Sequence, residues 1–173
     1  KYYFYYCTWD ATSGNGQQSI GVAVSDSPTG PFKDLGKPVV SGKVTDFGTE
    51  SSTWNDIDPT VWIEKDDKGE EHRYLAWGNG NYYICELNDD MISVKDQNGD
   101  GKITGGTSTK TADVIQKTSV TSYTEAPWLY RRQDANGNYY GKYYLFYASG
   151  WREGMSYATT DDLLNGEWSE GKE

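Results

Sequence analysis

Residues 142–147 read Lys-Tyr-Tyr-Leu-Phe-Tyr, and runs of the same kind stand at residues 1–5 (Lys-Tyr-Tyr-Phe-Tyr) and 73–77 (Arg-Tyr-Leu-Ala-Trp). Their spacing is about 70 residues, and each run stands in a similar order of strands and turns. Several strands repeated at a fixed period are typical of a β-propeller, in which each blade is a four-stranded sheet. The sequence therefore predicts an all-β chain of about three propeller blades.

Short β-type runs between turn signals make up most of the chain, whereas helical periodicity is almost absent. The turn signals, at residues 13–16, 67–69, 79–81 and 135–138, combine Gly with Asn or Asp, which suits hairpin turns. No linker rich in Pro, Ser and Gly divides residues 1–173, which indicates one domain or a piece of one. The predicted strands are residues 1–8, 19–25, 60–64, 73–77, 82–87, 128–131, 142–148 and 155–159.

The composition argues against disorder once the aromatic residues are counted. Leu, Ile, Val and Phe make up only 27 of 173 residues, which together with a net charge of -10 would by itself indicate disorder. The chain also has 7 Trp and 15 Tyr, and each of these can bury roughly 150–250 Å² in a core. We therefore expect an aromatic-rich β core, with Cys7 and Cys85 buried as free thiols.

The charge and the hydropathy pattern exclude several classes of partner. An acidic chain repels phosphate backbones, so we expect no nucleic-acid binding. No apolar run approaches the roughly 18 residues of a membrane-spanning helix, so we expect no membrane partner. No basic segment followed by an apolar one opens the chain, so no signal peptide is visible.

Two carboxylates recur at the same point of the repeat. Asp58 lies in Ile-Asp-Pro-Thr (57–60) and Glu125 in Thr-Glu-Ala-Pro (124–127), each just before the first strand of its unit. The first strands of propeller blades surround the central channel, so these two side chains are expected to converge there. Two simpler interpretations stay open, namely chance similarity among Tyr-rich hairpins and acidic residues that merely begin strands or turns.

A converging pair of carboxylates suits acid and base catalysis on a neutral substrate. Like charges and burial raise the pKa of one member of such a pair, which can then stay protonated as a general acid. Glu125 stands between Tyr123 and Trp128 and is the better candidate for the acid, whereas Asp58 stands among polar residues. Glycoside hydrolysis uses two carboxylates in this way.

Strand direction predicts which other residues lie beside the carboxylates. If the first strand of a unit runs away from Asp58, the next strand returns to the same face and ends at Trp77 and Asn79. The same argument brings Trp9 and Trp151 to that face. Tryptophan rings can stack on sugars, and Asn side chains can bond hydroxyls. These four residues are the predicted substrate-binding set, and core packing of each Trp is the alternative.

Four segments of the chain resemble glycoside hydrolase family 43. They are Ile20–Phe32, Ile57–Trp62, Glu86–Ser93 and Tyr123–Tyr130, and their order and spacing carry the resemblance. The similarity runs along essentially the whole chain, apart from the loops around residues 43–53 and 95–120. It implies that residues 1–173 are a partial catalytic domain, with about three blades of a five-bladed β-propeller.

The resemblance also implies an inverting mechanism and a role for each carboxylate. Glu125 is the implied general acid, and Asp58 is the implied carboxylate that orients the acid and tunes its pKa. The activities of the family are mainly α-L-arabinofuranosidase, β-xylosidase and arabinanase. The sequence around Asp58 and around Glu125 is most similar to that of arabinofuranosidases acting on arabinoxylan. This similarity implies an arabinoxylan-type oligo- or polysaccharide as substrate. Family members that degrade polysaccharides are often secreted, which implies an extracellular location.

One residue that the resemblance implies is missing. The general base of the family is an Asp in the first strand of the first blade, whereas residues 1–6 already match the second strand of that blade. Asp10 and Asp26 fall at the wrong phase to replace it. We therefore expect residues 1–173 to lack the base, and two further blades, and to be inactive on their own.

A loop rich in Asp, Asn and Gly is the remaining motif. Asp96, Asn98 and Asp100 fit the first positions of a calcium loop of EF-hand type, but the twelfth position is Thr107 and no amphipathic helices flank the loop. A surface loop is therefore the preferred interpretation, with a structural calcium as the alternative and no cofactor required. His72, the single histidine, is expected to be a solvated turn residue.

Two functions of other classes compete with a glycosidase. One is a non-catalytic carbohydrate-binding propeller, for which aromatic residues at the rim would suffice, and the other is a propeller scaffold for protein partners. A carbohydrate-binding protein has no use for two carboxylates in phase, and a scaffold predicts a wide apolar rim instead of loops rich in Asn, Gly, Ser and Thr. Asp58 and Glu125 therefore favour the glycosidase.

Overall fold

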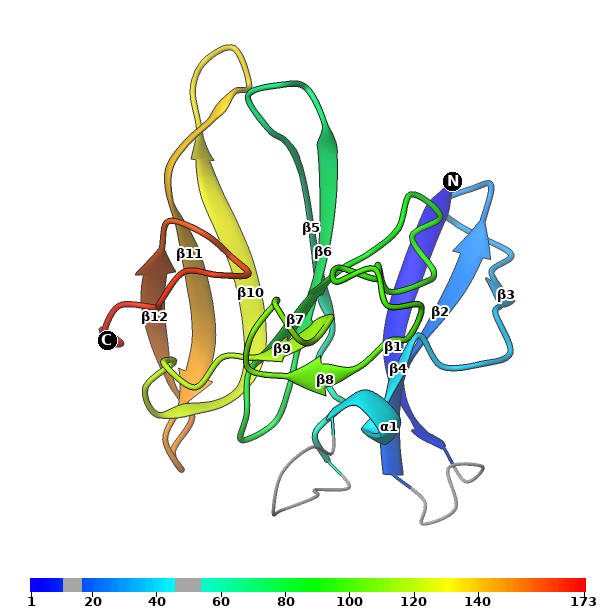
Figure 1. Ribbon diagram of the computed structural model, residues 1–173, viewed down its shortest axis with the longest axis horizontal. Coiled ribbons are helices and arrows are strands. Elements are labelled where there is room, and N and C mark those ends of the chain that lie inside the picture. Colours follow the sequence, from blue (N-terminus) through cyan, green and yellow to red (C-terminus); the bar gives the residue numbers. More distant parts are fainter. Residues whose placement is uncertain (11–16, 46–53) are drawn as a thin grey trace.

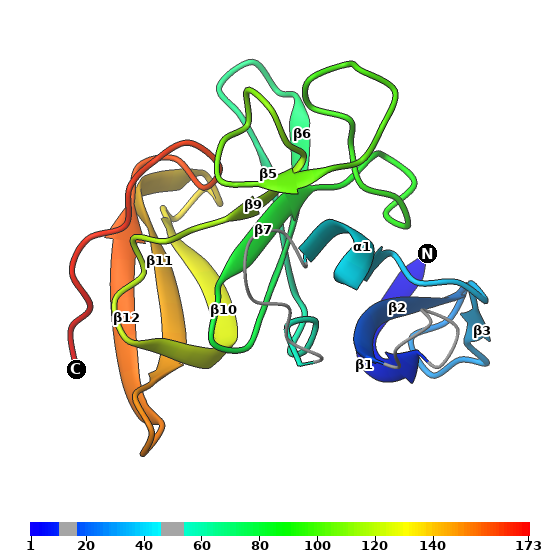
Figure 2. The same cartoon turned by 60° about the horizontal axis from the view of Figure 1, so that its bottom comes forward.

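A computed structural model describes residues 1–10, 17–45 and 54–173, so the turn signal at residues 13–16 lies outside the described residues. The described strands form three sheets that lie next to one another (Figure 1). The one helix within these ranges is α1 (Gly42–Thr45), and no described helix is long and apolar enough to cross a membrane. The sheets form an open arc (Figure 2), which confirms an all-β fold of the partial-propeller type.

The first sheet is built on a long antiparallel pair. β1 (Tyr2–Asp10) and β2 (Gln17–Ser25) pair along their whole length. β2 also pairs with the short strands β3 (Lys33–Asp34) and β4 (Val40–Ser41). In the described part of the chain β1 pairs with β2 alone and therefore forms an edge of this sheet.

The second and third sheets are built from consecutive hairpins. The second has the order β5 (Thr60–Lys65), β6 (Glu71–Trp77), β7 (Tyr83–Glu86), β9 (Val114–Gln116) and β8 (Gly105–Gly106), in which only the last pair is parallel. The third consists of β10 (Tyr123–Gln133), β11 (Tyr139–Ser149) and β12 (Gly154–Thr160). The predicted turns at residues 67–69 and 135–138 close the β5–β6 and β10–β11 hairpins.

All eight predicted strands are present, with somewhat different bounds. β10 begins five residues before the predicted run, and irregularities of its register with β11 accommodate Pro127 within the strand. The strands that were not predicted are β3, β4, β8 and β9. Each of them has two or three residues, which is too short for an alternation pattern to appear in the sequence.

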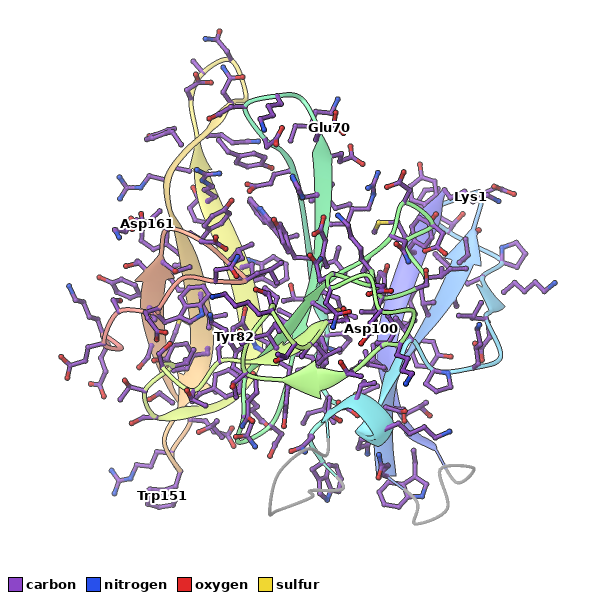
Figure 3. The ribbon with its side chains drawn as sticks, viewed as in Figure 1. Lys1, Glu70, Tyr82, Asp100, Trp151 and Asp161 are labelled. Atoms are coloured by element: carbon purple, nitrogen blue, oxygen red, sulfur yellow. The ribbon has the colours of Figure 1, made fainter. Side chains whose placement is uncertain are left out.

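Aromatic side chains fill the space between the sheets, as the composition predicted. One buried cluster joins the first sheet to the second, and another joins the second to the third. Tyr82, in the interior in Figure 3, lies 5.6 Å from the ring of Tyr123 and 5.8 Å from the ring of Trp168, measured between centroids. Cys85 is buried as expected, but Cys7 is exposed because it lies on the edge strand β1, which corrects that prediction.

Candidate active site

Loops from the second and third sheets meet at the end of the molecule opposite the β5–β6 turn (Figure 1). Asp58 lies two residues before β5, Asn79 lies two residues after β6, and Glu125 lies near the start of β10. The β11–β12 turn, which carries Trp151, reaches the same end (Figure 3). Antiparallel hairpins return the chain to the end at which they began, so segments far apart in the sequence meet there.

The structure brings Asp58, Asn79 and Glu125 together. The side-chain amide of Asn79 donates from Nδ2 to Oε2 of Glu125 at 2.8 Å. The backbone N–H of Ala126 donates to Oδ2 of Asp58 at 3.1 Å. Asp58 therefore contacts the residue that follows Glu125, and the two carboxylates from neighbouring sheets share one site.

The backbone of both carboxylate segments has an unusual conformation. Asp58 has a φ of 57° and Ala126 a φ of 56°, in the left-handed region that non-glycine residues rarely adopt, and each precedes a proline. When Pro59 and Pro127 are aligned, Asp58 corresponds to Ala126. Glu125 therefore lies one residue before the position in its unit that is equivalent to Asp58. Strain of this kind costs roughly 1–3 kcal/mol per residue and is concentrated at functional sites.

The turn formed by residues 78–80 is hydrogen-bonded to both carboxylate segments. Gly78 donates its N–H to the carbonyl of Ile57 at 3.0 Å, and Gly80 donates to the carbonyl of Thr124 at 2.7 Å. Gly78 has a φ of 137°, and a Cβ at this position would lie 1.9 Å from the carbonyl oxygen of Asn81. The sequence did not identify these backbone contacts, because the glycines carry no side chain that could indicate them.

Tyr123 lies beneath the site, and sequence reasoning did not assign it a place there. Its hydroxyl donates to the carbonyl of Gly78 at 2.9 Å, and its ring is buried. Burial raises the pKa of Tyr123, and Tyr82 and the nearby charges of Asp58 and Glu125 raise it further. The phenol therefore stays neutral and acts as a hydrogen-bond donor below the two carboxylates.

Trp77 does not lie on the surface of the site, which corrects its assignment to substrate binding. Its side chain is fully buried, and its indole N–H donates to Oδ1 of Asp56 at 2.8 Å. Asp56 is itself buried and also accepts the hydroxyl of Thr45 at 3.0 Å. A ring without an exposed face cannot stack on a sugar, so Trp77 belongs to the core.

The other two predicted tryptophans are exposed at the same end of the sheets. Trp9 is 52% exposed near the end of β1, and Trp151 is 86% exposed in the β11–β12 turn. The guanidinium of Arg152 lies 5.2 Å from the Trp151 ring centroid. The turn is held against the segment that carries Glu125, because the Thr124 hydroxyl donates to the carbonyl of Gly150 at 3.0 Å. The turn that carries Trp151 thus contacts the segment that carries Glu125.

The loop with the candidate calcium ligands is closed by its own backbone. Asp96 accepts the N–H groups of Gly99 at 2.7 Å and Gly101 at 2.8 Å. Asn98 and Asp100 each accept a backbone N–H two residues further on. Within the described ranges no group of three or more His, Cys, Asp or Glu side chains is arranged to hold a metal ion, and calcium at this loop stays a prediction.

Two curated proteins are similar to this chain along most of its length. A protein named β-D-galactofuranosidase xynD, from Aspergillus niger, is 33% identical over 166 residues, which cover 92% of this chain and 37% of the relative. A xylosidase/arabinosidase from Bacteroides ovatus is 26% identical over 185 residues, which cover 94% of this chain and 49% of the relative. The chain therefore spans about half or less of the length of these relatives.

Solved structures with a similar fold agree with this relationship. The structure of an α-L-arabinofuranosidase from Clostridium thermocellum is 30% identical, with a TM-score of 0.60, and the match covers 97% of this chain and 46% of that one. An endo-1,5-α-L-arabinanase from Thermotoga petrophila is 25% identical, with a TM-score of 0.60 and coverage of 98% and 39%. Residues 1–157 match the sequence profile of the glycosyl hydrolases family 43, and the chain belongs to that family.

Proposed function

We propose that residues 1–173 form part of a glycoside hydrolase that acts on arabinose- and xylose-containing polysaccharides by inversion, and that they contribute its general acid. One observation carries the proposal, namely the meeting of Asp58 and Glu125 from neighbouring sheets within one hydrogen-bonded set of loops. α-L-Arabinofuranosidase activity on an arabinoxylan-type substrate is the first candidate, because the structure of an arabinofuranosidase is among the relatives. β-Xylosidase or arabinanase activity is the alternative within the family.

The names of two relatives support a furanoside as substrate. One is an α-L-arabinofuranosidase and the other a β-D-galactofuranosidase. α-L-Arabinofuranose and β-D-galactofuranose have the same configuration around the five-membered ring and differ only in the substituent at C4. A pocket that recognises the ring hydroxyls of one can therefore recognise those of the other.

The proposed reaction moves one proton from the acid to the leaving group. Glu125 gives its proton to the glycosidic oxygen while the bond from this oxygen to the anomeric carbon breaks, and the electron pair stays on the leaving oxygen. A water molecule attacks the anomeric carbon from the opposite face, and its proton passes to a second carboxylate, which serves as the base. We assign no described residue to that base. Asp58 accepts the backbone N–H of Ala126 and thereby orients the segment that carries Glu125.

Aromatic residues at the rim are the proposed contacts of the sugar chain. Trp9 and Trp151 are exposed at the end of the sheets where the carboxylates lie. Indole rings stack on the apolar faces of sugar rings, and both tryptophans expose a ring for such a contact. The partner is accordingly an oligo- or polysaccharide.

Replacing the acid tests the proposal directly. In the protein expressed from its complete reading frame, Glu125→Gln should lower kcat on xylan- or arabinan-derived oligosaccharides by about 100- to 10,000-fold. Sugar binding, measured by calorimetry, should remain. The matched control is Glu70→Gln, since Glu70 lies in the turn at the opposite end of the second sheet (Figure 3).

The two other functions predict different results. Retained turnover in Glu125→Gln would refute the role of Glu125 as the acid. A wild-type protein that binds oligosaccharides without any turnover would instead identify a non-catalytic carbohydrate-binding propeller. A wild-type protein that neither binds nor cleaves oligosaccharides would leave the scaffold for protein partners.

A further inference from the structure

Asn79 contacts the carboxylate of Glu125 from a different sheet. The amide Nδ2 of Asn79, at the end of the second sheet, lies 2.8 Å from Oε2 of Glu125 in the third. An amide NH₂ group can only donate, so this oxygen of Glu125 serves as an acceptor. When Glu125 is protonated, the contact favours the arrangement in which the proton is on Oε1.

The backbone around Asn79 is held at both sides of the residue. Gly78 bonds to Ile57, next to Asp58, and Gly80 bonds to Thr124, next to Glu125. The buried hydroxyl of Tyr123 bonds to the carbonyl of Gly78. An amide on a turn fixed in this way presents its donor at a defined place, as a group that orients a catalytic side chain requires.

We propose that Asn79 is a positioning residue for the acid, which orients the carboxyl group of Glu125 and keeps its proton on Oε1, from which the proton passes to the glycosidic oxygen. The inference rests on the proposed function and deepens it. The position of Asn79 at a strand end predicts a contact with sugar hydroxyls, whereas the positioning role assigns its amide to the carboxyl group of Glu125.

A positioning role has a consequence that a sugar contact does not have. Protonation of the leaving oxygen matters most when the leaving group is a poor one, and hardly at all when the leaving anion is stable by itself. Loss of the Asn79 amide should therefore slow the cleavage of glycosides with basic leaving groups selectively. Loss of a sugar contact would lower kcat/KM by the same factor for all substrates that carry the same sugar.

The experiment compares two substrates in variants of the protein expressed from its complete reading frame. The substrates are 2,4-dinitrophenyl and phenyl α-L-arabinofuranoside, or the matching β-D-xylosides if the protein prefers xylose. In Asn79→Asp and Asn79→Ala we expect kcat on the phenyl glycoside to fall about 10- to 100-fold, while kcat on the dinitrophenyl glycoside changes less than about threefold. KM should stay unchanged for both.

Asn81→Asp is the matched control, with the same isosteric change two residues further along the chain. Asn81 Oδ1 accepts Nε2 of Gln116 at 2.6 Å, and an aspartate at this position can still accept this bond. The control should keep wild-type kinetics on both substrates. Circular dichroism reports whether each variant is folded, and Asn79→Asp, which keeps the volume of the side chain, serves if Asn79→Ala unfolds.

Two outcomes would overturn the positioning role. One is an equal loss of activity on both glycosides, or a raised KM with unchanged kcat, either of which makes Asn79 a sugar-binding residue. The other is wild-type kinetics in both Asn79 variants while Glu125→Gln is inactive, which removes the positioning role and leaves the proposed function intact. Full activity of Glu125→Gln would instead remove the proposed function itself.

Discussion

Three residues with positive φ set the geometry of the site. Asp58 and Ala126 adopt the left-handed conformation before a proline, and Gly78 has a φ of 137° that a residue with a side chain rarely adopts. Asp58 is itself part of the hydrogen-bonded site, Ala126 follows Glu125, and Gly78 precedes Asn79. The rare backbone conformations therefore occur at or next to the three side chains whose orientation defines the site.

Gly78→Ala should destabilise the protein strongly, because the added Cβ would lie 1.9 Å from a backbone oxygen that cannot move away by rotating a side chain. We expect the free energy of unfolding to fall by about 3 kcal/mol or more. The control is Gly80→Ala, at a φ of +69° with no heavy atom within 4 Å, for which we expect about 1 kcal/mol. Denaturant titration measures both, and equal stabilities of the two variants would contradict the steric argument.

A buried carboxylate ties the strands of the second sheet to the following loop. Glu86, at the end of β7, accepts Nε2 of Gln97 at 2.8 Å and Nζ of Lys95 at 2.9 Å. Nδ1 of His72, on β6, lies 2.8 Å from Oε1 of Glu86. The prediction of His72 as a solvated turn residue is wrong, because His72 lies within β6 and is partly buried, with its side chain against Glu86 of the neighbouring strand β7.

Glu86 should make the stability depend on pH in the acid range. Burial raises the pKa of Glu86, but the bonds from Gln97, Lys95 and His72 together outweigh burial and lower it below its ordinary value. A lowered pKa in the folded state means that the stabilisation is present above the ordinary Glu pKa of about 4.3 and is lost as the pH falls below it. Between pH 7 and pH 3, Glu86→Gln should therefore lose less stability than the wild type.

Denaturant titrations at the two pH values measure this difference. The control is Glu70→Gln, at the exposed tip of the β5–β6 hairpin, which should follow the wild type. A Glu86→Gln variant whose stability falls with pH as steeply as that of the wild type would contradict the assignment of the acid sensitivity to this carboxylate.

The three sheets pack through buried clusters rich in aromatic side chains. The first and third sheets form the two ends of the arc (Figure 2), and both carry exposed apolar side chains. On the third sheet Trp128, Tyr130 and Met155 are exposed, and on the first sheet Tyr2 and Phe4 are exposed. Residues 1–157 match the family profile, yet the chain spans less than half of several relatives. The site formed by Asp58, Asn79 and Glu125 lies between the second and third sheets.

The 173-residue polypeptide by itself should not turn over 4-nitrophenyl α-L-arabinofuranoside. Inversion needs an acid and a base about 6.5–9.5 Å apart with water between them. Of the two carboxylates in the described site, Glu125 is the proposed acid, and Asp58 is engaged with the N–H group beside that acid. The release of nitrophenol is the measurement, with the protein from the complete reading frame as the positive control. Clear turnover by the 173 residues would show that they contain a base.

The sequence by itself determined the fold class, the eight main strands and the two carboxylates. Alternation, turn chemistry and the spacing of the Tyr-rich runs are local properties, so they can be read without knowing what lies next to what. The same patterns indicated that Asp58, Asn79 and Glu125 lie at one end of the sheets, because antiparallel hairpins return the chain to that end.

Only the tertiary structure decided which side chains at that end are accessible and which contact each other. Trp77 is the last residue of one repeated strand and Trp151 comes two residues after another, yet Trp77 is fully buried against Asp56 and Trp151 is 86% exposed. The contact of Asn79 with Glu125 joins two sheets, and no local pattern specifies such a pair. Burial and hydrogen-bond partners depend on the packing of segments far apart in the sequence, and for that physical reason they were decided by the fold as a whole.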